Sequence, residues 1–166
     1  MLRPHLMVDS VHQVSAEVLR ERGVSGVLLD LDDTLLPAAA DAPEPQVLAW
    51  VEGLQRAGFG VVILSNGEPK RVAALAARLN CQAVALSGKP FAPAFRRALR
   101  LLGTPRAETA MIGDQVFTDV LGANLAGLVS ILVRPLSAGK LPHTRMIRHL
   151  ERMILRGGDR GRPVHR

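Results

Sequence analysis

Short apolar runs alternate with amphipathic segments along most of the chain, and this alternation predicts the fold. We expect buried strands at 24–31, 60–64, 82–86, 109–112 and 128–133. Apolar residues at helical spacing predict helices at 45–57, 68–79, 93–102 and 116–126, and a further helix at 15–22 with Ser15 as its N-cap. Continuous apolar strands separated by helices indicate a parallel sheet covered on both faces. The prediction is therefore an α/β fold, a Rossmann-like three-layer parallel sheet.

The bulk composition favours one globular domain over residues 1–166. Hydrophobic residues make up 48% of the chain, and no linker or internal repeat divides it. Cys81 is the single cysteine, which rules out an internal disulfide. The apolar stretch at Leu6–Val8 is interrupted at once by Asp9, and no apolar run approaches the roughly 20 residues of a membrane span. We expect a cytoplasmic protein, with peripheral contact to the inner face of the membrane left open.

The positive charge is concentrated at the C-terminal end. The net charge is +6, and the segment from His143 to Arg166 has seven arginines against Glu151 and Asp159, so it carries +5 of that total. The rest of the chain is nearly neutral, so no nucleic-acid partner is expected. We expect a basic amphipathic helix or tail at about 143–166, with Arg145, Arg148, Arg152 and Arg156 on one side. The apolar side of this helix is expected to pack on the domain, and the basic side to meet an anionic membrane; both interpretations stay open.

Polar groups follow four of the predicted strands. They are Asp30, Asp32 and Thr34 after the first, Ser65 and Asn66 after the second, Gly88 and Lys89 after the third, and Gly113 and Asp114 after the fourth. The carboxyl ends of parallel strands meet at one edge of the sheet, so these groups should converge. Each motif alone has an ordinary interpretation, such as an acidic turn, a helix cap or a surface lysine. Their order and spacing favour a site instead.

The residue types in that crevice suit phosphoryl transfer. A carboxylate, Asp30, can attack phosphorus, and a second carboxylate two residues on, Asp32, can move the proton of the leaving oxygen and then of water. Three acidic groups in one crevice (Asp30, Asp114 and Asp119) would repel one another without a hard cation, and oxygen ligands favour Mg²⁺. The Ser65 hydroxyl and the Lys89 ammonium can hold the phosphoryl oxygens.

The same residues resemble the four motifs of the haloacid dehalogenase (HAD) superfamily. Residues 27–35, 61–66, 89–90 and 111–119 match motifs one to four in order. The resemblance implies Asp30 as nucleophile, Asp32 as general acid and base, and Lys89 as the group that steadies the charged intermediate. It implies phosphate binding by Ser65, to which we add Asn66 and Thr34. It also implies Mg²⁺ bound by Asp30, the backbone carbonyl of Asp32 and Asp114, with Asp119 at or just behind the metal.

A narrower resemblance, over roughly residues 2–157, is to the YqeG-type HAD subfamily IIIA. Relatives in fungi and plants are phosphatidylglycerophosphate phosphatases; Asp33 stands where many of them carry Asn. The gaps at 35–59 and 66–86 are too short for an inserted cap domain, so we expect a capless, open site. An open site suits an anionic lipid headgroup at a membrane, or a homo-oligomer that closes the site itself.

Three functions remain in competition at this stage. The first is a phosphatidylglycerophosphate phosphatase acting at the membrane surface. The second is a soluble HAD phosphatase for a small phosphorylated metabolite. The third is a non-catalytic binding module associated with ribosomes or their assembly, whose basic tail contacts RNA phosphates. The complete set of catalytic residue types argues against the third.

Overall fold

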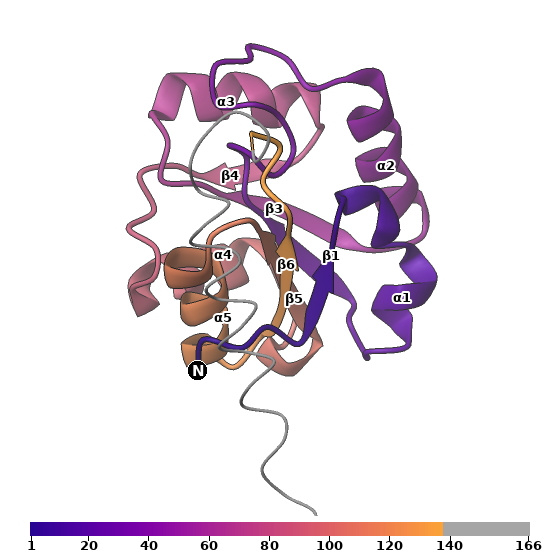
Figure 1. Ribbon diagram of the computed structural model, residues 1–166, viewed down its shortest axis with the longest axis vertical. Helices are drawn as coiled ribbons and strands as arrows, with labels where there is room; N and C mark the ends of the chain where they lie inside the picture. Colours follow the sequence, from indigo (N-terminus) through magenta and orange to yellow (C-terminus); the bar gives the residue numbers. More distant parts are fainter. Residues whose placement is uncertain (138–166) are drawn as a thin grey trace, which may run out of the picture. The chain divides into compact units, whose positions relative to one another are not determined.

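The computed structural model describes residues 1–137, which form a sheet with helices on both of its faces (Figure 1). The sheet has six strands in the order β1-β6-β5-β2-β3-β4, and every neighbouring pair is parallel. The strands are β1 (Leu6–Val8), β2 (Gly26–Leu29), β3 (Gly60–Leu64), β4 (Gln82–Val84), β5 (Thr109–Gly113) and β6 (Val129–Val133). The strand order reverses at β2, between β3 on one side and β5 on the other.

Alternate residues of the central strands enter two separate cores. Val27 and Leu29 lie in a core with residues of α1, α2 and α3, whereas Leu28 lies in a second core with residues of α4 and α5. The helices are α1 (Ala16–Arg20), α2 (Pro45–Arg56), α3 (Pro69–Arg78), α4 (Ala92–Leu102) and α5 (Leu121–Ala126). All three side chains are fully buried, each worth about 1.5–3 kcal/mol in removed apolar surface. This confirms the predicted three-layer α/β fold.

Short connections leave no room for a cap domain. One loop and α2 separate β2 from β3, and only α3 separates β3 from β4. The capless form of the fold is therefore confirmed.

Helix boundaries follow local capping chemistry. Ser15 caps α1 as predicted, because its side chain accepts a hydrogen bond from the N–H of Val18. Glu68 caps α3 by accepting from the N–H groups of Lys70 and Arg71, with Pro69 in the first helical position. α4 ends at Gly103, whose φ of 75° closes the helix in the left-handed region.

Three elements differ from the sequence prediction. β1 was not expected; it is three residues long and pairs with β6, with Leu6 opposite Ile131. The expected strand at 24–31 ends at Leu29, because the chain folds back there and the carbonyl of Leu31 accepts the N–H groups of Thr34 and Leu35. The helix expected at 116–126 begins with a π-helical turn, η3 (Val116–Val120), before α5. Two 3₁₀ turns, η1 (Val11–Gln13) and η2 (Arg106–Glu108), complete the described elements.

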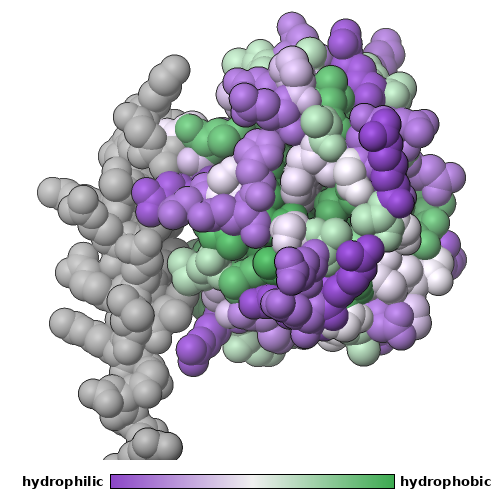
Figure 2. All heavy atoms as spheres, turned by 90° about the vertical axis from the view of Figure 1, so that its right-hand side faces the viewer, coloured by the Kyte–Doolittle hydropathy of each residue, from purple (hydrophilic) through white to green (hydrophobic). Residues whose placement is uncertain are grey.

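The surface over α1 and α2 is mostly hydrophilic, with hydrophobic residues visible in the hollows between polar ones (Figure 2). The helices of residues 1–137 include none with both the length and the apolar character that crossing a bilayer requires. The basic helix or tail expected at about 143–166, including Arg145, Arg148, Arg152 and Arg156, lies outside the described residues.

Candidate active site

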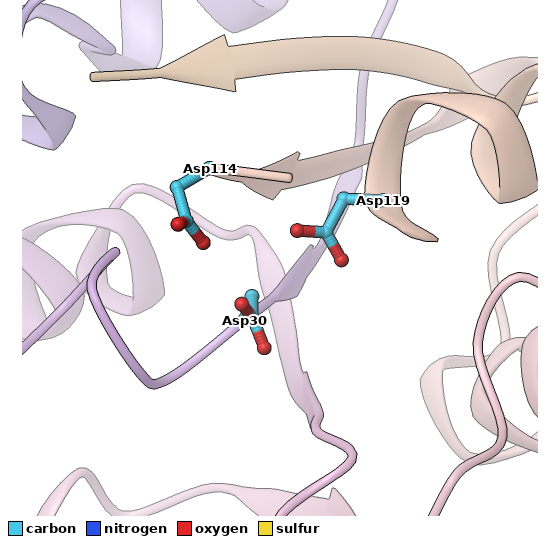
Figure 3. Close-up of side chains that lie close together, drawn as sticks. All are labelled: Asp30, Asp114 and Asp119. Atoms are coloured by element: carbon cyan, nitrogen blue, oxygen red, sulfur yellow. The ribbon is translucent and has the colours of Figure 1, made fainter. Parts of the chain in front are cut away.

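Three aspartates from separate elements converge at the carboxyl edge of the sheet. Asp30 follows β2 directly, Asp114 follows β5, and Asp119 lies in η3. Their carboxylates point toward one another (Figure 3), and one oxygen from each lies within 4.8 Å of the others. The N–H of Asp30 donates to the carbonyl of Ile112, which extends the pairing of β2 with β5 up to the site. The sheet itself therefore determines the distance between Asp30 and Asp114.

Lys89 lies between two of these carboxylates. Its Nζ is 2.8 Å from Asp30 Oδ1 and 2.7 Å from Asp119 Oδ1, and its side chain is only 3% exposed. Burial alone would lower the pKa of Lys89, but the charges of Asp119 and Asp30 outweigh burial and raise it. The lysine is therefore an ammonium ion held in the interior by two carboxylates.

Asp119 has hydrogen-bond partners on both oxygens. Oδ1 accepts from Lys89, and Oδ2 accepts from the N–H of Gln115 at 3.1 Å. The side chain packs so closely over β5 that a Cβ added to Gly113 would collide with its carboxylate. Gly113 and the π-helical turn thus place Asp119 against Lys89.

Asp114 is the least compensated of the three. Thr34 Oγ1 donates to its Oδ1 at 3.1 Å, and no cation of residues 1–137 forms an ion pair with it. Burial, followed by the charges of Asp30 and Asp119, raises the pKa of Asp114 to about 8. Burial also raises the pKa of Asp119, to about 6, although Lys89 acts in the opposite direction. Three carboxylates around one ammonium leave the cluster short of positive charge.

The loop after β3 supplies a hydroxyl and connects to the Lys89 loop. Ser65 is buried, and its Oγ accepts from the N–H of Gly67 at 3.0 Å, which leaves the hydroxyl proton free to donate. The Asn66 side chain accepts from Ser87 Oγ and from the N–H of Lys89, and it donates to the carbonyl of Lys89. The backbone N–H of Asn66 has no acceptor among residues 1–137. Asn66 therefore contacts the Lys89 loop through its side chain and leaves its amide available.

Asp32 lies further out, at the rim of the site. Its Oδ1 is 2.7 Å from Nη1 of Arg71, and the two side chains are 34% and 26% exposed. The predicted residues thus fall into two groups at one edge of the sheet. Lys89 joins Asp30 and Asp119 by ion pairs, and Asp114 lies beside them with a hydrogen bond from Thr34. Asp32 instead faces Arg71.

Sequence reasoning missed three contributors to this arrangement. Arg71 was given no role in the sequence analysis, because an arginine beside Lys70 in a predicted helix carries no signal of its own. Gly113 was placed in the fourth motif without the steric reason that the structure supplies. Ser87, which bonds Asn66, gave no sequence signal.

Known proteins share both the sequence and the fold. Residues 86–151 match a family model described as HAD-hydrolase-like. Probable phosphatase YqeG of Bacillus subtilis (strain 168) is 35% identical over 152 residues, which are 92% of this chain and 88% of that protein. The chloroplastic/mitochondrial phosphatidylglycerophosphate phosphatase 1 of Arabidopsis thaliana is 27% identical over 92% of this chain, a match that spans 47% of the plant protein.

Among solved structures, a HAD phosphatase from Thermococcus onnurineus shares the fold with a TM-score of 0.52 and 21% identity, over 72% of this chain and 60% of that one. Fold and site together define a phosphatase of the α/β class. The chain belongs to the HAD superfamily, among the YqeG-type phosphatases. The resemblance drawn from its four motifs is confirmed, and so is its assignment as an enzyme.

Proposed function

We propose that this phosphatase is Mg²⁺-dependent, forms an aspartyl-phosphate on Asp30, and acts on phosphatidylglycerophosphate. The observation that supports the mechanism best is the buried contact of Lys89 with both Asp30 and Asp119, beside Asp114. This arrangement places the buried Asp30 carboxylate 2.8 Å from an ammonium ion at the end of β2, where a carboxylate nucleophile would meet a phosphoryl group.

The acidic cluster fits a divalent cation. Its available ligand atoms are carboxylate oxygens, which suit Mg²⁺. Burial, followed by the charges of Asp30 and Asp119, raises the pKa of Asp114, and a bound cation would offset this cost of ionising it. Asp30, Asp114 and the backbone carbonyl of Asp32 would hold the ion. Asp119 would stand behind them, because both of its oxygens already have protein partners. A bound Mg²⁺ would neutralise charge on the phosphoryl oxygens.

The proposed reaction has two steps, formation and hydrolysis of the aspartyl-phosphate. An Asp30 oxygen attacks phosphorus, the phosphorus–oxygen bond to the alcohol breaks, and Asp32 gives its proton to the departing oxygen. Water next attacks the phosphorus of the aspartyl-phosphate, Asp32 takes a proton from that water, and the bond to Asp30 breaks to release inorganic phosphate. Lys89, the Ser65 hydroxyl and the backbone N–H of Asn66 would bind phosphoryl oxygens. Thr34 would act through its hydrogen bond to Asp114.

The relatives support the substrate part of the proposal. The plant relative is named as a phosphatidylglycerophosphate phosphatase, and its match covers most of this chain. The capless architecture leaves the site without an inserted domain above it, which suits a headgroup presented by a membrane. The contacts of Arg145, Arg148, Arg152 and Arg156 with an anionic bilayer, and closure of the site by a homo-oligomer, stay predictions.

The test is phosphate release with Mg²⁺ from phosphatidylglycerophosphate in mixed micelles, beside a panel of soluble phosphomonoesters. Wild type is compared with Asp30→Asn and with a matched control, Asp33→Asn. Asp33 adopts a φ of 61°, which asparagine also tolerates, so this control removes a neighbouring acid without straining the loop. We expect Asp30→Asn to lose at least about 10³-fold in turnover while Asp33→Asn stays within about threefold.

Turnover retained in Asp30→Asn would contradict the aspartyl-phosphate mechanism. Faster release from a soluble ester than from the lipid would leave the mechanism in place and replace the lipid with a small metabolite as the substrate.

A further inference from the structure

Arg71 contacts two parts of the loop that carries Asp32. It lies in the first turn of α3, where its N–H donates to the cap residue Glu68. Its Nη1 is 2.7 Å from Asp32 Oδ1, and its Nη2 donates to the carbonyl of Ala40 at 3.0 Å. One planar guanidinium therefore joins α3, Asp32 and the loop that leads to α2. A surface ion pair that served only solubility would not need the second contact.

The two oxygens of Asp32 have different surroundings. Oδ1 is bound by Arg71, whereas Oδ2 forms no hydrogen bond with any of residues 1–137. A Cβ added to Gly67 would stand 3.7 Å from Asp32 Oδ2 and 3.1 Å from Ser65 Oγ, so both oxygens border Gly67. A side chain at Gly67 would crowd both of them. Asp32 is thus anchored through one oxygen, and its other oxygen borders Gly67 with no hydrogen-bond partner among residues 1–137.

We propose that Arg71 is a positioning residue that holds Asp32 for proton transfer to the leaving oxygen. This inference rests on the proposed function of the same site. The Asp32 side chain is about one-third exposed, so packing restricts its rotation less than full burial would. A fork-shaped guanidinium with a second backbone contact does restrict it, because both of its nitrogens must keep their partners. Misplacing a catalytic group by about 1 Å can cost about 10²-fold in rate.

The proton transfer gives this role a distinctive signature. When the bond between phosphorus and an alkyl oxygen breaks, the departing alkoxide is a strong base and needs the Asp32 proton. A nitrophenolate leaves readily without a proton. A variant with a misplaced Asp32 should therefore be impaired mainly on alkyl phosphates. A general disturbance of the fold would impair both esters alike.

The experiment measures kcat/KM with Mg²⁺ for p-nitrophenyl phosphate and for an alkyl monophosphate, because kcat/KM reports on steps up to the first irreversible one. The full-length proteins are wild type, Arg71→Ala, Arg71→Lys and the control Lys70→Ala. Lys70 is exposed and adjacent, and its side chain makes no contact with Asp32. We expect Arg71→Ala to lose about 10–100-fold on the alkyl ester and less than about threefold on the nitrophenyl ester. Lys70→Ala should lose neither activity.

Arg71→Lys keeps the charge and serves if Arg71→Ala does not fold. One ammonium cannot contact both Asp32 and the carbonyl of Ala40 as the guanidinium does. Arg71→Lys should therefore show the same selective loss of activity on the alkyl ester, but a smaller one. Equal losses on both esters, or no loss on either, would overturn the positioning role while leaving the proposed function standing. A wild-type protein that hydrolyses neither ester would contradict the proposed function, and this inference with it.

Discussion

An inner and an outer cation–carboxylate contact of the site have nearly equal lengths but very different surroundings. Lys89 and Asp30 are 2.8 Å apart, with side chains 3% and 7% exposed. Arg71 and Asp32 are 2.7 Å apart, with side chains 26% and 34% exposed. The inner pair is surrounded by further carboxylates, whereas the outer pair is bordered by solvent and a backbone carbonyl.

Burial gives these two pairs different consequences. Removing one partner of a buried pair leaves a charge that water cannot reach, which costs about 3–5 kcal/mol. An exposed pair contributes about 0–1 kcal/mol, because water replaces the lost partner. The inner contact should therefore govern the stability of the site, whereas the outer contact should affect the orientation of a side chain more than stability.

The largest expected effect is on Lys89. In EDTA, Lys89→Met should lower the free energy of unfolding by about 3–5 kcal/mol, because three carboxylates then face one another without an ammonium ion. Urea unfolding followed by circular dichroism measures this, with Lys70→Met as the exposed control. A loss below about 1 kcal/mol would mean that the inner pair behaves like the outer one.

The second effect is a dependence of folding stability on pH, which arises from the inner carboxylates Asp114 and Asp119. Asp114 and Asp119 have pKa values raised to about 8 and about 6, so each binds its proton more tightly in the folded protein than in the unfolded chain. The stability they contribute is complete below their ordinary pKa of 3.8 and is lost as the pH rises through the raised values. Without metal, the protein should thus lose stability between about pH 4 and pH 8.

Between pH 6 and pH 8 the loss should be about 1–2 kcal/mol, given a limit of about 1.4 kcal/mol per pH unit for one proton and some screening at the partly exposed Asp114. Saturating Mg²⁺ should abolish the decline, and Mg²⁺ should bind more tightly as the pH rises. Melting temperatures in EDTA and in Mg²⁺ across this range measure both. A stability that rises with pH in EDTA would contradict these shifts.

The third effect concerns the support of Asp119. Gly113→Ala should destabilise the protein by about 1–3 kcal/mol, since its methyl group would collide with the Asp119 carboxylate. The matched control is Gly53→Ala in α2, where an added Cβ meets no atom within 4 Å. That change should raise helix propensity and stabilise by about 0.5–1 kcal/mol. Chemical denaturation measures the free energy of unfolding of both variants. Equal changes in the two would refute the steric argument.

The smallest effect on stability is expected at the outer pair. Arg71→Ala should change the free energy of unfolding by less than about 1 kcal/mol, in the same urea experiment as Lys89→Met. A loss of 3 kcal/mol or more would show that Arg71 is a structural residue. Any loss of catalysis in Arg71→Ala would then result from damage to the fold.

The sequence could predict that Asp30 and Asp114 converge, because each directly follows an apolar strand. Asp30 follows three buried apolar residues, where an aspartate has no ordinary structural reason to stand. The series of apolar strands also predicted that the two residues meet at the carboxyl edge of a parallel sheet. What it could not provide was the contact of one lysine with two carboxylates, which depends on side chains 59 and 30 positions apart.

The outer site and the sheet edge were harder to predict. Arg71 occupies an exposed helical turn, where arginine is common for solubility alone. β1 has only three residues between polar neighbours, and its partner lies at the far end of the described chain. The π-helical turn at Val116–Val120 depends on tertiary contacts that periodicity does not record.

The pairing of β1 with β6 has a consequence for synthesis on the ribosome. Leu6 lies opposite Ile131, so β1 emerges about 125 residues before the strand that pairs with it. At about 5–20 residues per second, this strand waits about 6–25 s for its neighbour. β2, β3 and β4 can pair during that time, with Asp30 already in place at the end of β2. The acidic cluster closes only after β5 and η3 have emerged, so a ribosome that stalls before residue 119 would carry Asp30 without the Asp119 carboxylate that completes the cluster.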